Sequence, residues 1–206
     1  MGDSEGSVAA LKRTLDTMPT CAPAILTMGS VEYLAGRSAA GRESFQSLLS
    51  LPKRTEDIRR IIDEAGTFLT RTGAYEDGMA LYRTAVKRYP DAATLFQGLG
   101  YCAGKAGLHE EAVSASQRAV ELEPDNQEMV NDLGWTLAEA GRLLEAREIL
   151  ERAVAMDPSD ELARENLRLC KQRAAGGRIG KAGNAQAASR GPRTIRRKSA
   201  AHRRSP

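Results

Sequence analysis

Apolar residues recur along most of the chain with the spacing of amphipathic helices rather than the alternation of strands. On a helical wheel of about 100° per residue, Val130, Leu133 and Leu137 fall in one apolar stripe. This run stops at Gly141, and a second amphipathic run stops at Pro158. Glycine and proline commonly end helices. The pattern therefore predicts two helices joined by a tight turn.

The helix-pair pattern returns every 34 residues. Glycine, alanine and proline form four columns in one register: Gly66, Gly100 and Gly134; Gly73, Gly107 and Gly141; Ala85, Ala119 and Ala153; and Pro90, Pro124 and Pro158. Small residues form a fifth column at Gly78, Ala112 and Ala146. A fixed period of this length is typical of solenoids. Small residues predict close helix approach, and a larger residue there would cost about 1–3 kcal/mol by overpacking.

These columns resemble those of the tetratricopeptide repeat (TPR) family. One repeat matches with Phe96, Leu99, Gly100, Gly107, Ala112, Ala119 and Pro124. The next matches with Val130, Leu133, Gly134, Gly141, Ala146, Ala153 and Pro158. The preceding repeat is weaker, because Ala65 replaces leucine and Gly78 replaces alanine. The resemblance implies an all-α fold, a right-handed TPR superhelix (α-solenoid) of stacked antiparallel helix pairs.

The pattern also divides the chain into segments. These are an N-terminal half-repeat helix (1–21), a degenerate TPR (22–58), three TPRs (59–92, 93–126 and 127–160), a capping helix (161–173) and a disordered basic tail (174–206). In the degenerate repeat, Met28, Gly29, Gly36 and Phe45 occupy expected places, but Pro52 comes one residue early. The polar face of the capping helix suits the exposed end of a solenoid.

The resemblance implies a concave face made by the first helix of each pair, where TPR proteins bind peptides or helices of partners. The predicted groove consists of Asp63, Thr67, Gln97, Tyr101, Glu128, Asn131 and Trp135. Tyr101 and Trp135 are candidate binding hot spots. Gln97 and Asn131 offer donors and an acceptor to an extended backbone. Alternatively, the two aromatic residues pack between neighbouring repeats.

The groove lacks the residues of one well-defined TPR subclass. That subclass clamps the C-terminal carboxylate of heat-shock chaperones with lysine, asparagine and arginine. In the register that starts at residue 59, the clamp positions hold Asp63, Thr67, Gly98, Glu128 and Asp132. In the register that starts at 22, they hold Leu26, Ser30, Glu64, Thr94 and Gly98. Neither set offers a cation, so a neutral or basic peptide is favoured over a carboxylate. The alternative is a merely solvated acidic face.

The net charge of +3 is distributed unevenly. Residues 1–173 hold 21 Lys/Arg and 27 Asp/Glu, or −6, whereas 174–206 hold nine Lys/Arg and no acid, or +9. The tail lacks hydrophobic periodicity, which predicts disorder. Its charge favours weak, salt-sensitive contact with nucleic acid or an anionic membrane, although it has no aromatic residue for base stacking.

The tail has two other readings. It can dock in the acidic body of the chain, and the sequence RRKS at 196–199 resembles a basophilic kinase site whose phosphorylation would weaken that docking. It can also be a solvated segment with no target.

The residue types give little support to catalysis, a cofactor or a metal. The two histidines, His109 and His202, lie at a turn and in the tail. No Cys/His spacing suggests zinc. The glycine-rich run 98–104 lies inside a helical repeat rather than in a phosphate-binding loop. We therefore expect a non-enzymatic protein.

Composition and the N-terminus indicate the compartment. The chain is 41% hydrophobic and 28% charged, and it has no apolar run long enough for a membrane span. The acidic N-terminus does not read as a secretory signal. Three widely spaced cysteines, Cys21, Cys102 and Cys170, suggest reduced thiols. We expect a cytoplasmic location.

The sequence thus predicts a non-catalytic adaptor or scaffold that binds a partner peptide or helix in the concave groove. The alternatives are a small secretion-type TPR chaperone, a nucleic-acid-associated protein that acts through its tail, and a homo-oligomer formed by solenoid stacking at the N-terminal half repeat.

Overall fold

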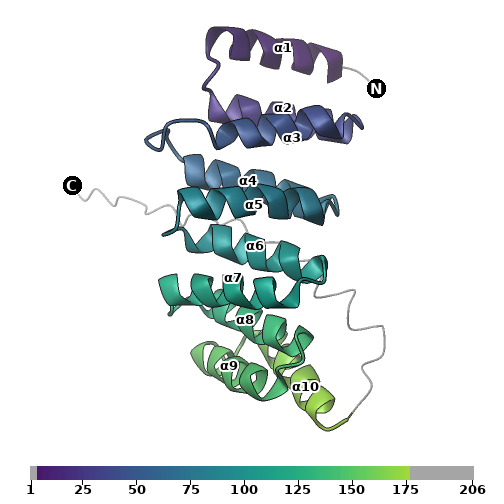
Figure 1. Ribbon diagram of the computed structural model, residues 1–206, viewed down its shortest axis with the longest axis vertical. Coiled ribbons are helices and arrows are strands. Elements are labelled where there is room, and N and C mark those ends of the chain that lie inside the picture. The colour runs from purple at the N-terminus through teal and green to yellow at the C-terminus, as the bar shows by residue number, and fades with distance from the viewer. Residues whose placement is uncertain (1–3, 177–206) are drawn as a thin grey trace, which may run out of the picture.

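The structure is a computed structural model, and it describes residues 4–176. Every regular element in this range is a helix: α1 (Ser4–Thr17), α2 (Ala22–Leu34), α3 (Ser38–Leu48), α4 (Ile58–Arg71), α5 (Tyr75–Arg88), α6 (Ala93–Lys105), α7 (His109–Leu122), α8 (Gln127–Glu139), α9 (Leu143–Met156) and α10 (Glu161–Ala174). Figure 1 shows these helices stacked in chain order along the longest axis of the molecule, from α1 at one end to α9 and α10 at the other. The sequence predicts a disordered basic tail at residues 174–206. Of this tail, residues 177–206 lie outside the described part of the chain.

Each helix packs mainly against its neighbours in the sequence. The pairs α2/α3, α4/α5, α6/α7 and α8/α9 pack closely, and the first helices α2, α4, α6 and α8 also contact one another in order. Helix α1 packs on α2, and α10 packs on both α8 and α9. The predicted all-α solenoid of stacked helix pairs, closed by a C-terminal helix, is confirmed.

Glycines end the first helix of each pair. Gly73, Gly107 and Gly141 have φ angles of 77°, 77° and 80°. Gly36, in the degenerate repeat, has a φ of 79°. This left-handed conformation costs glycine little and turns the chain sharply into the second helix. The glycine column predicted from the sequence therefore marks the turns.

A second glycine column allows the two helices of a pair to approach closely. A Cβ atom at Gly66 would lie 2.2 Å from Tyr82 Cζ, and one at Gly134 would lie 2.6 Å from Leu150 Cγ. No side chain fits at such distances. Glycine is therefore required here by packing, as its place in the repeat predicts.

The buried apolar side chains form two clusters. The first, which we call the N-terminal core, runs from Ala22 to Ala115 and includes Phe45, Ile62 and Tyr82. The second, the C-terminal core, runs from Ala93 to Cys170. Helices α6 and α7 contribute residues to both cores, so the two halves of the solenoid meet at this helix pair.

Candidate peptide-binding face

The predicted groove residues lie on three consecutive first helices. Asp63 and Thr67 come from α4, Gln97 and Tyr101 from α6, and Glu128, Asn131 and Trp135 from α8. Because α4 contacts α6 and α6 contacts α8, the structure brings the three helices together. We call the surface that carries these residues the first-helix face.

Most of these side chains reach the surface at least in part. Glu128 is exposed. Partly exposed residues are Asp63, Thr67, Gln97, Tyr101 and Trp135. Asn131 is the exception, with only 2% of its surface exposed. Six of the seven residues are therefore open to contact with another molecule.

The C-terminal helix covers Asn131. The Nδ2 atom of Asn166 on α10 donates a hydrogen bond of 3.0 Å to Asn131 Oδ1, and both residues are buried. This bond satisfies a polar group that would be costly to bury alone. Asn131, expected to face a ligand, instead fixes α10 against α8.

Trp135 lies at the junction of α8 and α10. The guanidinium of Arg173 stands 5.4 Å from the centroid of the Trp135 ring, a cation–π distance. Arg173 also donates a hydrogen bond of 3.0 Å to the carbonyl of Ala138. The last turn of α10 therefore packs against the Trp135 ring, while the residue as a whole stays partly exposed.

Tyr101 has comparable neighbours on α5 and α6. Its ring meets that of Tyr75 edge to face, with centroids 6.3 Å apart. The ammonium of Lys105 stands 5.5 Å from the Tyr101 centroid. Both aromatic residues of the face thus pack partly within the protein and remain partly exposed.

Two carboxyl groups of the face are held by neutral donors. Gln97 Nε2 donates to Asp132 Oδ2 at 2.8 Å, and the hydroxyl of Tyr82 donates to Asp63 Oδ1 at 3.0 Å. Burial raises the pKa of Asp132 to about 7, with the charges of Glu128 and Asp160 adding to the rise. Burial likewise raises the pKa of Asp63 to about 6. Burial penalises the charged form, and no cation offsets it at either site.

The Tyr82 hydroxyl reaches the first-helix face from the second helix of its repeat. Two hydrogen-bonded pairs are 35 residues apart: Gln97–Asp132 joins α6 to α8, and Asn131–Asn166 joins α8 to α10. The same spacing would join Asp63 to residue 98, which is Gly98. The Tyr82 ring fills this gap, since a Cβ atom on Gly98 would lie 2.2 Å from Tyr82 Cζ. Sequence reasoning missed this bridge.

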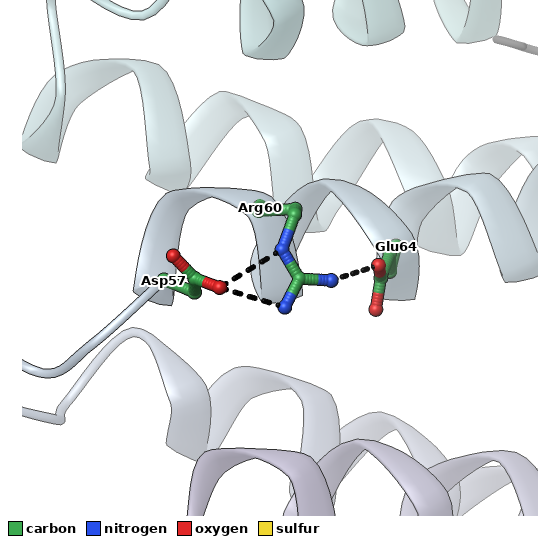
Figure 2. Close-up of polar contacts among 3 residues, drawn as sticks. All are labelled: Asp57, Arg60 and Glu64. Carbon is green, nitrogen blue, oxygen red and sulfur yellow. Dashed lines mark hydrogen bonds and ion pairs between the residues drawn. The ribbon is translucent and has the colours of Figure 1, made fainter. Parts of the chain in front are cut away.

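The arginine on this face of α4 is already paired. Figure 2 shows Arg60 between Asp57, at 3.0 Å, and Glu64. In contrast, Asp63, Glu128 and Asp132 form no ion pair with any described residue. The acidic character expected of this face is therefore carried by carboxyl groups without a counter-charge.

Other parts of the described chain offer little chemistry. Between residues 4 and 176 no group of three metal-ligating side chains gathers, and no helix there has the length and apolarity to cross a membrane. Cys102 is fully buried, which raises the pKa of its thiol to about 12. A hollow between α3, α4 and α5 is lined by residues such as Phe45 and Asp77, and none of the residues that line it belongs to the first-helix face.

Family models identify the repeats. Two tetratricopeptide-repeat models match residues 69–122 and 103–168. The chain is a tetratricopeptide-repeat protein, as its glycine, alanine and proline columns predicted. A search of curated protein sequences returns no match.

Solved structures share the fold. The TPR protein YrrB, described as having an unusual peptide-binding site, aligns over 78% of this chain and 81% of its own, with 20% identity and a TM-score of 0.57. MamA from Desulfovibrio magneticus RS-1 aligns over 78% of this chain and 89% of its own, with 19% identity and a TM-score of 0.55. The second TPR domain of human RPAP3, solved with the HSP70 peptide SGPTIEEVD, aligns over 52% of this chain and 90% of its own, with 21% identity and a TM-score of 0.50. At these identities the likeness concerns the fold alone.

Proposed function

We propose that this TPR protein is a non-catalytic adaptor whose first-helix face binds a peptide or helix of a partner protein. The observation that carries the proposal is the pair Tyr101 and Trp135. They occupy the same repeat position on neighbouring helices, and both are partly exposed. Large aromatic side chains in such places supply much of the energy of protein recognition.

Rigidity supports the same function. Tyr101 is held by Tyr75 and Lys105, and Trp135 by Arg173. A side chain that is already fixed loses little conformational entropy when a ligand binds. The ordering cost of binding therefore falls mainly on the partner.

The charges of the face favour a neutral or basic ligand. The peptide bound by the human RPAP3 domain, SGPTIEEVD, is acidic at its C-terminal end. The corresponding clamp positions of this chain carry Asp63, Glu128 and Asp132 instead of cations. Carboxyl groups without a counter-charge repel an acidic end and attract lysine or arginine.

Affinity capture tests the proposal. Nuclease-treated lysate is passed over the wild-type chain and over a Tyr101→Ala/Trp135→Ala variant. A Leu108→Ala/Leu144→Ala variant serves as the matched control, because it removes apolar side chains that are 42% and 71% exposed outside this face. Proteins held by the wild type and the control but lost from the folded aromatic variant support the proposal. Equal retention by all three chains contradicts it.

A further inference from the structure

The first-helix face ends where a strongly basic segment of the same chain begins. Arg173, which stacks on Trp135, lies three residues before Gly176, the last described residue. Thirty residues follow, with nine Lys/Arg and no Asp/Glu. We propose that residues 177–206 are an intramolecular ligand of the first-helix face and compete with partner peptides; this inference rests on the function proposed above.

The face has acceptors for such a segment. One oxygen of Asp63 is bonded to Tyr82 and one oxygen of Asp132 to Gln97. The second oxygen of each carboxyl has no hydrogen-bond partner among the described residues. Every fully buried side-chain oxygen of the described residues does have such a partner. Neither free oxygen is therefore completely buried, and each can accept a hydrogen bond from lysine or arginine.

The pKa values of the two carboxyls fit this role. Burial raises the pKa of Asp63 to about 6 and that of Asp132 to about 7. A cation at each free oxygen would oppose this rise, since it stabilises the charged form. The positive charges already on the face do not serve this purpose. Arg60 is paired with Asp57 and Glu64, and Lys105 and Arg173 stand over the rings of Tyr101 and Trp135 and form no ion pair with either carboxyl.

The segment is long enough and close enough to reach each helix. An extended chain of 30 residues spans up to about 100 Å, and packed helices lie about 8–10 Å apart. A tether of this length gives an effective concentration of about 1 mM. A face that binds the free segment with a Kd of about 0.1 mM would then be occupied in about nine of ten molecules.

Competition with an added peptide tests the proposal. The probe is a labelled synthetic peptide of residues 177–206, titrated into two versions of the 206-residue chain. One is the wild type, and the other carries Arg193→Gln, Arg196→Gln, Arg197→Gln and Lys198→Gln. The expected result is a Kd about ten-fold lower for the substituted chain, because its own segment competes less. Equal Kd values for the two chains, or no binding to either, would overturn the proposal.

Two further variants of the substituted chain locate the site. Asp63→Asn/Asp132→Asn removes both charges but keeps an acceptor for Tyr82 and Gln97, and it should abolish binding of the probe. The matched control, Glu43→Gln/Glu148→Gln, removes two charges from exposed sites on the second helices α3 and α9 and should leave the Kd unchanged. Equal loss in both variants would mean general electrostatic attraction and would contradict a site on this face.

The fluorescence of Trp135, the only tryptophan, distinguishes the occupant. In the wild-type chain at low salt, Trp135 should be shielded from an added quencher, and the tail substitutions should remove this shielding. If the shielding disappears on dilution, the occupant is the segment of a second copy, and the intramolecular proposal is wrong. This inference can fail while the proposed function stands. That is the case if the Tyr101→Ala/Trp135→Ala variant still loses a protein that the wild-type chain captures from lysate.

Discussion

Gly98→Ala probes the contact between two repeats at its tightest point. A Cβ atom at residue 98 would lie 2.2 Å from Tyr82 Cζ and 2.6 Å from Tyr82 Cε1. The ring cannot retreat, because Gly66 packs against its other edge, where a Cβ atom would also lie 2.2 Å from Tyr82 Cζ, and Tyr82 is fully buried. The substitution therefore forces a shift of the ring or of helix α6.

The magnitude follows from three contributions. Overpacking of this severity costs about 3 kcal/mol. A displaced ring also loses the bond from its hydroxyl to Asp63, worth about 1 kcal/mol. Alanine regains about 1 kcal/mol of helix propensity over glycine. We therefore expect the free energy of unfolding to fall by about 3 kcal/mol.

Urea unfolding followed by circular dichroism measures this change, with Gly104→Ala as the matched control on the same helix. A Cβ atom there would meet nothing closer than Ala112 Cβ at 3.8 Å. Gly104→Ala should raise the free energy of unfolding by up to about 1 kcal/mol. If Gly98→Ala proves as stable as Gly104→Ala, the Tyr82 ring does not occupy the space between the repeats and the reasoning is refuted.

Two other predictions concern stability. Asn166→Ala leaves Asn131 buried without its hydrogen-bond partner, so the free energy of unfolding should fall by about 1–3 kcal/mol. In the same urea experiment, the double variant Asn131→Ala/Asn166→Ala should lose less stability than the two single variants together. The raised pKa values of Asp63 and Asp132 mean that between about pH 4 and 7 the folded state binds more protons than the unfolded state. Stability should therefore decrease as the pH rises through this range, by at most about 1.4 kcal/mol per pH unit for each carboxyl. Urea midpoints at several pH values should show a flatter dependence in Asp63→Asn/Asp132→Asn, and an unchanged slope would contradict these pKa values.

Much of the fold could be predicted because single residue types decide the local structure. A glycine such as Gly107 adopts a left-handed conformation at a turn, and Gly134 leaves room for Leu150. Both requirements act within one repeat, so a 34-residue period exposes them. The register of the wheel also placed Val130, Leu133 and Leu137 correctly in the core.

The candidate site was harder to predict because it depends on contacts between repeats. A wheel separates apolar from polar faces, but it cannot tell a polar residue that faces solvent from one that meets the next helix. Asn131 was placed in the groove for this reason, although Asn166 covers it. The bridge from Tyr82 to Asp63 escaped notice because it depends on the absence of a side chain at Gly98. In the next repeat, the position equivalent to Gly98 holds the larger Asp132. There the position equivalent to Tyr82 holds the smaller Ser116.

The division of the buried side chains into an N-terminal and a C-terminal core has a mechanical consequence. Asp63 lies on a helix of the first core and Trp135 on a helix of the second. In a stack where each repeat contacts only its neighbours, small rotations at each contact accumulate into bending of the whole. A ligand that binds both residues would restrain bending of the solenoid at α6 and α7. Such a ligand would couple the motions of the two halves of the solenoid.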